Sequence, residues 1–186
     1  MSFKSPELYG GAITVELPAG FVDASGIRQI PDHQEVYLDS NSYSSIVFDI
    51  LERVEKPDDE AALQYHFADL IEGTGDETNV LGQGKATMLK MPNKPVYSLN
   101  YIQTPPRPDS AHHRKTPDFV SIHLLLLRLE EQATDITITI NVPHYSGEYV
   151  KAREGEPTQL MKDGETVKQK ILESFEIKDW GLFGEN

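Results

Sequence analysis

The sequence predicts an α+β fold in which a mainly antiparallel β-sheet carries helices on both faces, an α/β/α sandwich. Most of the strand-like segments are joined by short, turn-rich connections, which suit antiparallel neighbours. Two segments, residues 57–71 and 163–177, carry apolar residues at helical spacing. Residues 119–129 are apolar on both faces of a strand, as expected where both faces of a sheet are covered.

The first strand is expected over residues 13–17, where apolar and polar residues alternate, and Pro18 ends it. Small, polar and charged residues follow as far as Glu35, and Val36 begins the next strand. A polar segment that leaves a sheet and returns to it is a common way for a rigid scaffold to present a functional loop.

The charged residues of this loop allow two interpretations. Asp23 could cap a short helical turn, and Arg28 could pair with Asp32, which would be purely structural roles. Alternatively, the carboxylates of Asp23, Asp32 and Glu35 form a binding surface. An acid and base role for Asp32, His33 and Glu35 is doubtful, because neighbouring residues on a strand point to alternating faces.

A strand over residues 45–51 follows a polar turn, and Asp49 interrupts one of its apolar faces. A buried carboxylate without a partner is costly, so Asp49 should have hydrogen-bond donors, lie at a sheet edge or face another protein. Glu52 ends the strand, where it either extends the same acidic surface or is simply solvated.

The first helix is expected over residues 57–71, with Asp58 as its N-cap and acidic residues in its first turn. Gly73 and Gly75 follow the helix and end it. His66 lies beside the apolar stripe and is expected to be a packed or half-exposed histidine rather than a metal ligand.

Two strands, over residues 85–91 and 96–102, are expected to form a hairpin. The second has an aromatic face that could hold a base or a lipid but more often packs beneath a helix. Residues 104–117 contain four of the twelve prolines and should form an extended surface loop. The residues of the aromatic face are Tyr97, Leu99 and Tyr101.

Residues 119–129 and 135–142 are expected to be neighbouring antiparallel strands, the second with one wetter face. A final helix is expected over residues 163–177. Trp180 and the apolar residues after it should dock the C-terminus onto the body of the fold.

Length and composition favour one domain over residues 1–186, with a core that needs no covalent staples. No apolar run approaches the roughly 18 residues of a membrane span, and the N-terminus lacks the pattern of a secretory signal. The absence of cysteine excludes disulfides and thiolate zinc sites. No phosphate-binding loop or metal-ligand cluster is present, so no cofactor or metal is expected.

The chain is acidic, with a net charge of −13 from 30 acidic and 17 basic residues. Phosphate contacts require a basic face, so nucleic acids and anionic membrane surfaces are disfavoured as partners. An acidic surface instead attracts basic partners and accelerates their encounter at low salt.

The sequence resembles the Ran guanine nucleotide release factor family, the MOG-type nuclear import proteins that bind the small GTPase Ran. The N-terminal blocks are the specific part of this resemblance, and the later blocks extend it over nearly the whole chain. The segments that carry it are LYGGA at 8–12, FVDAS at 21–25, Arg28, PDHQEVY at 31–37, SIVFDILE at 45–52, YHFADL at 65–70, LRL at 127–129, TDI at 134–136 and LFG at 182–184.

The resemblance implies a PsbP-like fold and a monomeric, non-catalytic protein that binds Ran, promotes guanine nucleotide release and supports nuclear import. It implies residence in the nucleus and cytoplasm, mainly in the nucleus. In that family, acidic residues at the positions of Asp49 and Glu52 are implicated in gripping Ran. The expected contact patch is therefore Asp23, Arg28, Asp32, Glu35, Asp49 and Glu52. The alternative is a small-molecule or lipid-binding module of the same fold without a GTPase partner.

Overall fold

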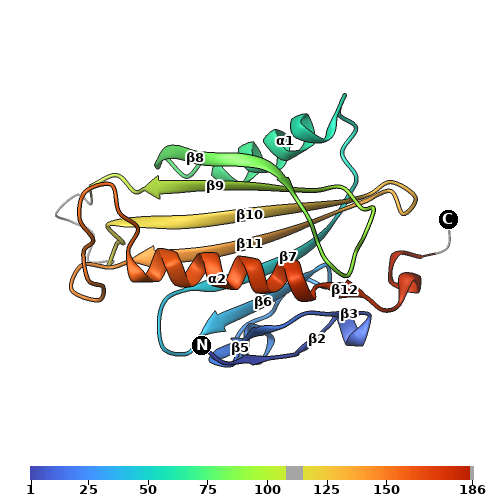
Figure 1. The fold of residues 1–186 in the computed structure, drawn as a ribbon, viewed down its shortest axis with the longest axis horizontal. Coiled ribbons are helices and arrows are strands. Elements are labelled where there is room, and N and C mark those ends of the chain that lie inside the picture. Colours follow the sequence, from blue (N-terminus) through green and yellow to red (C-terminus); the bar gives the residue numbers. More distant parts are fainter. Residues whose placement is uncertain (108–114, 185–186) are drawn as a thin grey trace.

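The computed structural model describes residues 1–107 and 115–184. A seven-stranded, wholly antiparallel sheet has the order β5-β6-β7-β11-β10-β9-β8, and α2 lies across its front in Figure 1 while α1 covers the other face. The predicted α/β/α sandwich is confirmed. The strands are β5 (Phe21–Asp23), β6 (Gln34–Asp39), β7 (Ser45–Glu52), β8 (Glu77–Ala86), β9 (Val96–Thr104), β10 (Phe119–Leu129) and β11 (Thr134–His144).

Short strands at the two ends of the chain form two smaller sheets, and the one made of β2, β3 and β12 lies to the right of β5 in Figure 1. The strand expected over residues 13–17 is broken into β3 and β4, which pair with different neighbours. Alternation of apolar and polar residues shows only that one face of a segment is buried. In residues 13–17 the apolar face packs towards α2. Glu16 N donates to Ser174 Oγ at 2.9 Å. These elements are β1 (Phe3–Lys4), β2 (Glu7–Leu8), η1 (Tyr9–Gly11), β3 (Ile13–Thr14), β4 (Leu17–Pro18), η2 (Ala24–Gly26), β12 (Glu176–Ile177) and η3 (Trp180–Phe183).

Helix α2 (Gln159–Ser174) covers the central strands on one face and encloses the larger of two apolar cores. It begins before the predicted start at residue 163, because Thr158 caps it by accepting from Met161 N at 3.1 Å. A Cβ at Gly164 would lie 3.0 Å from Val142 Cγ2, so the glycine lets the helix approach the sheet closely.

Helix α1 (Asp59–Ile71) covers the other face, and its predicted cap is confirmed by a 2.7 Å bond from Ala61 N to the Asp58 carboxylate. The aromatic strand face expected to pack beneath a helix does so, with the Phe67 and Tyr101 rings 4.8 Å apart. Because Tyr97 is also buried there, this face offers no open platform for a ligand.

The hairpin predicted over residues 85–102 is wrong in its first strand. The partner of β9 is β8, a sheet edge that is polar, glycine-containing and largely exposed, so no alternation marks it. The apolar residues of the predicted strand belong to the connection after β8, where Met88 and Met91 fill the core beneath α2. Leu89 N donates to Leu172 O at 3.0 Å, which ties this connection to the end of α2.

Strands β10 and β11 confirm the predicted central pair, and both faces of β10 are buried. The face of β11 expected to be wetter is polar but mostly buried, since Thr137 and Thr139 lie beside α1. The proline-rich loop expected over residues 104–117 lies partly outside the described residues. In the described ranges, no helix is long and apolar enough to cross a membrane.

Candidate functional site

The six residues expected to bind a partner lie along one edge of the main sheet, on β5, β6, β7 and the loop between the first two. The loop returns close to the end of β7, where Ile50 N donates to His33 O at 2.9 Å. The tertiary structure therefore brings residues 32, 33, 49 and 52 to the same end of the sheet.

Asp49 lies within the sheet, between β6 and β11, and faces the side covered by α1. Its Oδ2 accepts from Gln34 Nε2 at 3.0 Å, and its Oδ1 lies 3.5 Å from His33 Nε2. Burial raises the pKa of Asp49, which Gln34 and His33 only partly offset. Asp49 Oδ1 is buried, and no hydrogen-bond donor from the described residues bonds it.

A cavity of about 190 Å³ opens beside Asp49, between the polar face of β11 and the end of α1. Thr137, Thr139 and Asn141 form its polar floor, and Leu70 and Tyr101 form part of its apolar wall. Such a cavity is large enough for the head of one extended side chain rather than for a drug-sized molecule.

Glu35 lies on the opposite face of the sheet from Asp49, because it is the neighbour of Gln34 on β6. Its Oε1 accepts from Tyr9 N at 2.7 Å, and Tyr9 Oη donates to Phe48 O at 3.2 Å. Burial raises the pKa of Glu35 despite the bond from Tyr9. The carboxylate thus holds the N-terminal segment onto the sheet.

Asp23 caps η2 by accepting from Ser25 N at 2.8 Å, as the structural interpretation of the loop expected. Arg28 and Asp32 are exposed, and the pair that the structural interpretation allowed between them is not among the ion pairs of the described residues. His33 turns towards Asp49 while Glu35 bonds the Tyr9 backbone, so Asp32, His33 and Glu35 do not converge on one point.

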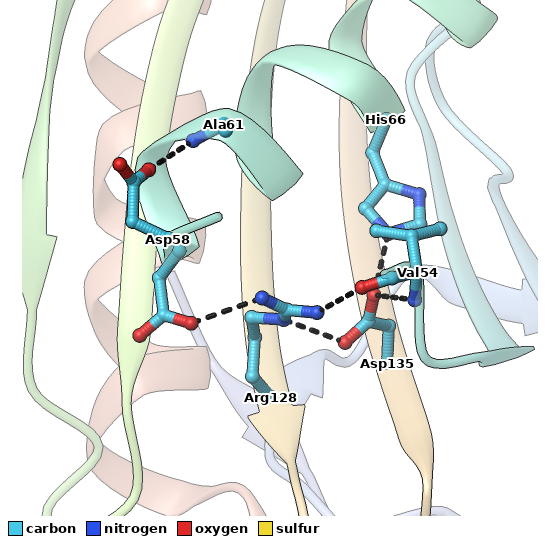
Figure 2. A network of polar contacts seen from close by, with 7 residues as sticks. Val54, Asp58, Ala61, His66, Arg128 and Asp135 are labelled. Atoms are coloured by element: carbon cyan, nitrogen blue, oxygen red, sulfur yellow. Dashed lines mark hydrogen bonds and ion pairs between the residues drawn. The ribbon is translucent and has the colours of Figure 1, made fainter. Parts of the chain in front are cut away.

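A buried polar network on the same sheet face, two residues along β11 from the strand partner of Asp49, escaped the sequence analysis. Figure 2 shows His66, Arg128 and Val54 converging on Asp135, which is fully buried. The Asp135 carboxylate accepts from His66 Nε2 at 2.8 Å, from Arg128 Nε at 2.9 Å and from Val54 N at 3.1 Å. Because a carboxylate only accepts, His66 carries its proton on Nε2.

Arg128 extends this network to the start of α1. It donates from its two terminal nitrogens to Asp59 Oδ1 at 3.0 Å and to Val54 O at 2.7 Å. Burial alone would raise the pKa of Asp135, but the bonds from His66 and Arg128 outweigh it and hold that pKa below its usual value. The network fastens α1 and the chain after Glu52 to the sheet, and so positions the end of β7.

One sequence signal could have revealed this network. Arg128 stands within an apolar strand that is buried on both faces, and a buried guanidinium requires carboxylate or carbonyl partners. The pattern did not say which acidic residue supplies them. Within the described ranges, no group of three or more His, Cys, Asp or Glu side chains is placed to hold a metal ion.

Comparison with known proteins gives consistent matches over most of the chain. A family model described as Ran-interacting Mog1 protein matches residues 6–143. The nuclear import protein MOG1 of Saccharomyces cerevisiae is 34% identical, over 98% of this chain and 86% of the relative. A probable ran guanine nucleotide release factor of Dictyostelium discoideum is 29% identical, over 100% of this chain and 98% of the relative.

The fold is also found among solved structures. The crystal structure of the Saccharomyces cerevisiae Ran-binding protein Mog1p matches with a TM-score of 0.77 and 29% identity, covering 99% of this chain and all of the matched chain. A Ran guanine nucleotide release factor of Danio rerio is 29% identical over 97% of this chain and its own full length.

Proposed function

The chain belongs to the Ran-interacting Mog1 family, and on this premise we propose that it binds the small GTPase Ran and promotes release of its guanine nucleotide. Relatives that match nearly the whole chain are named as Ran guanine nucleotide release factors and as a nuclear import protein. The proposal therefore includes support of nuclear protein import.

The observation that carries the proposal is the incompletely paired carboxylate of Asp49 beside a small, polar-floored cavity. A lysine or arginine of the GTPase would enter this cavity and complete the hydrogen bonds of Asp49. Charge-assisted hydrogen bonds of this kind are short and about twice as strong as neutral ones.

The remaining residues of the proposed contact patch act in two ways. Asp32, Arg28 and Glu52 are exposed at the same edge of the sheet and would touch the partner directly. Asp23 and Glu35 hold η2 and the Tyr9 segment in place, and so shape the surface next to them.

The protein acts by differential binding rather than by bond-making chemistry. It promotes release only if it binds nucleotide-free Ran more tightly than nucleotide-bound Ran, and each tenfold difference corresponds to about 1.4 kcal/mol. The coupling is reciprocal, so added GTP should displace the protein from Ran. This difference in affinity would come from carboxylates of this chain that hold basic groups of Ran. Those basic groups otherwise support the bound phosphates.

The functional unit is a monomer in which residues 1–186 form one domain, without cofactor or metal. Its net charge of −13 disfavours nucleic acids and anionic membranes as further partners. With a role in nuclear import, the protein would reside in the nucleus and cytoplasm, mainly in the nucleus.

The test is the release of a fluorescent guanine nucleotide from purified Ran. Wild-type protein should accelerate release, whereas Asp49→Asn and Asp32→Lys should each reduce the acceleration about tenfold, the cost of roughly one charged contact. Asp49→Asn keeps the shape of the side chain, so a loss reports its charge.

The matched control is Glu154→Lys, which makes the same charge change as Asp32→Lys on an exposed residue of the loop before α2. It should accelerate nucleotide release from Ran as much as the wild type does. If Glu154→Lys loses as much activity as Asp32→Lys, general charge attraction rather than this patch explains binding. If the wild-type protein accelerates nothing, the proposed function is wrong.

A further inference from the structure

A large hollow lies on the α2 face of the sheet, away from Asp49. It has a volume of about 830 Å³ and lies between strands β8, β9 and β10, the loop over residues 145–157 and the first turn of α2. A second hollow of about 370 Å³ adjoins it and shares three of its wall residues. The apolar side chains around the larger hollow are Leu81, Ile102, Phe119, Tyr149, Pro157 and Met161.

The hollow exists because one helix cannot cover seven strands. Helix α2 packs on β10 and β11, so the same face of β8 and β9 is left beside it without a helix. The pairing of β8 with β9 is interrupted by a bulge between Val80 and Gly82, which contains Leu81. Leu81 is 53% exposed and lines both hollows.

The aromatic floor of the hollow is held rigidly. The Phe119 ring stacks on His144 with 4.0 Å between ring centres, and Tyr149 packs edge-on against His144 at 4.8 Å. His144 is buried and held between Thr158 Oγ1 at 2.7 Å and Val142 O at 2.9 Å. A floor fixed in this way requires little reordering when a ligand binds, which favours affinity.

The charges around the hollow disfavour an anion. The charged lining residues are two carboxylates, Asp118 and Glu156, and one ammonium group, Lys151. The chain as a whole adds a strong negative field, with a net charge of −13. Aromatic faces attract cations and stack on planar rings.

We propose that this hollow is a binding site for a small, apolar, ring-bearing molecule that is neutral or positively charged. Its size is that of a site for a drug-sized ligand, and its walls are apolar with a few polar groups at the rim. It lies across the sheet from Asp49, so its occupation is a property separate from the proposed contact with Ran.

The test uses two dyes with the same ring skeleton. N-phenyl-1-naphthylamine is neutral, and 1-anilinonaphthalene-8-sulfonate adds one negative charge to the same rings. The neutral dye should bind the full chain at a ratio of one to one with a dissociation constant of about 10 µM. The sulfonate should bind about tenfold more weakly, with the difference shrinking as salt screens the charges.

Two substitutions locate the dye. Leu81→Ser removes part of the wall and Met161→Trp fills the hollow, so each should weaken binding of the neutral dye about tenfold. Leu89→Ser is the matched control, because Leu89 is 66% exposed and does not line the hollow. A melting curve establishes that each variant is folded. If Met161→Trp does not fold, Leu81→Ser alone tests the proposal.

The proposal is overturned if Leu81→Ser and Leu89→Ser bind the neutral dye equally well. It is also overturned if the sulfonate binds as tightly as the neutral dye at low salt, or if the neutral dye does not bind. Nucleotide release from Ran by Leu81→Ser should equal that of the wild type, so the outcome is distinct from that of the proposed function.

Discussion

Two aspartate–histidine pairs lie on the same face of the sheet and differ in nearly every physical respect. Asp49 and His33 approach only to 3.5 Å, with the histidine 51% exposed. Asp135 and His66 lie 2.8 Å apart and are 0% and 5% exposed. Both aspartates belong to adjacent strands, β7 and β11, so their place in the sheet does not cause the difference.

The difference lies in the donors that surround each carboxylate. Asp135 receives bonds from a histidine, an arginine and a backbone amide, which together lower its pKa below the usual value against the effect of burial. Asp49 has a single firm donor, Gln34, and burial raises its pKa. The completed set of donors gives Asp135 a structural role, whereas the proposed function assigns the missing donor of Asp49 to the partner.

The largest expected difference is in stability. Asp135→Ala should lower the free energy of unfolding by about 3–5 kcal/mol, because it leaves the buried guanidinium of Arg128 without its carboxylate. Asp49→Ala should lower the free energy of unfolding by less than about 1 kcal/mol. Urea unfolding of both variants measures this, and equal losses would contradict the distinction between the two pairs.

Replacing the two histidines should affect the stability of the protein in the same order, by smaller amounts. His66→Ala should destabilise the protein by about 1–3 kcal/mol, because it removes a buried hydrogen bond to Asp135. His33→Ala should change stability by no more than about 0.5 kcal/mol, as at other exposed positions. Thermal melting of the two variants side by side compares them, and a larger shift for His33→Ala would refute this ranking.

The smallest expected effect is in the dependence of stability on pH. Because the pKa of Asp49 is raised in the folded protein, its contribution to stability is greatest at low pH. This contribution falls as pH rises from the usual value of 3.8 through the raised pKa. Asp49→Asn should abolish that decline, so its stability relative to the wild type should rise over the same interval.

Asp135 should behave in the opposite way in the wild-type protein. Its lowered pKa means that its contribution is fully present above pH 3.8 and is lost as pH falls through the lowered pKa. Unfolding free energies of the wild type and Asp49→Asn, measured between pH 3 and pH 7, test the sign for Asp49, and the same comparison with Asp135→Asn tests the sign for Asp135. A constant difference between the two proteins would show that Asp49 does not titrate differently on folding.

Local patterns predicted the elements whose burial follows a regular period. The alternation around Phe48 in β7 and the doubly apolar run of β10 identified central strands, and Asp58 identified the start of α1. The same reasoning missed β8, because an exposed edge strand with Gly82 and Gly84 has no buried face to produce alternation. It also placed the start of α2 too late, at residue 163, although Thr158 caps the helix.

By itself, the sequence determined the α+β fold, the approximate place of the acidic edge and the family of the chain, since these depend on local periodicity and on motifs of neighbouring residues. Only the tertiary structure decided which carboxylates have a complete set of hydrogen-bond donors. Arg128 is the partner of Asp135 across the β10–β11 hairpin, but the other two donors stand 69 and 81 positions away along the chain, and no local pattern encodes contacts over such separations. Packing brings those donors to Asp135 and leaves Asp49 with Gln34 alone as a firm donor.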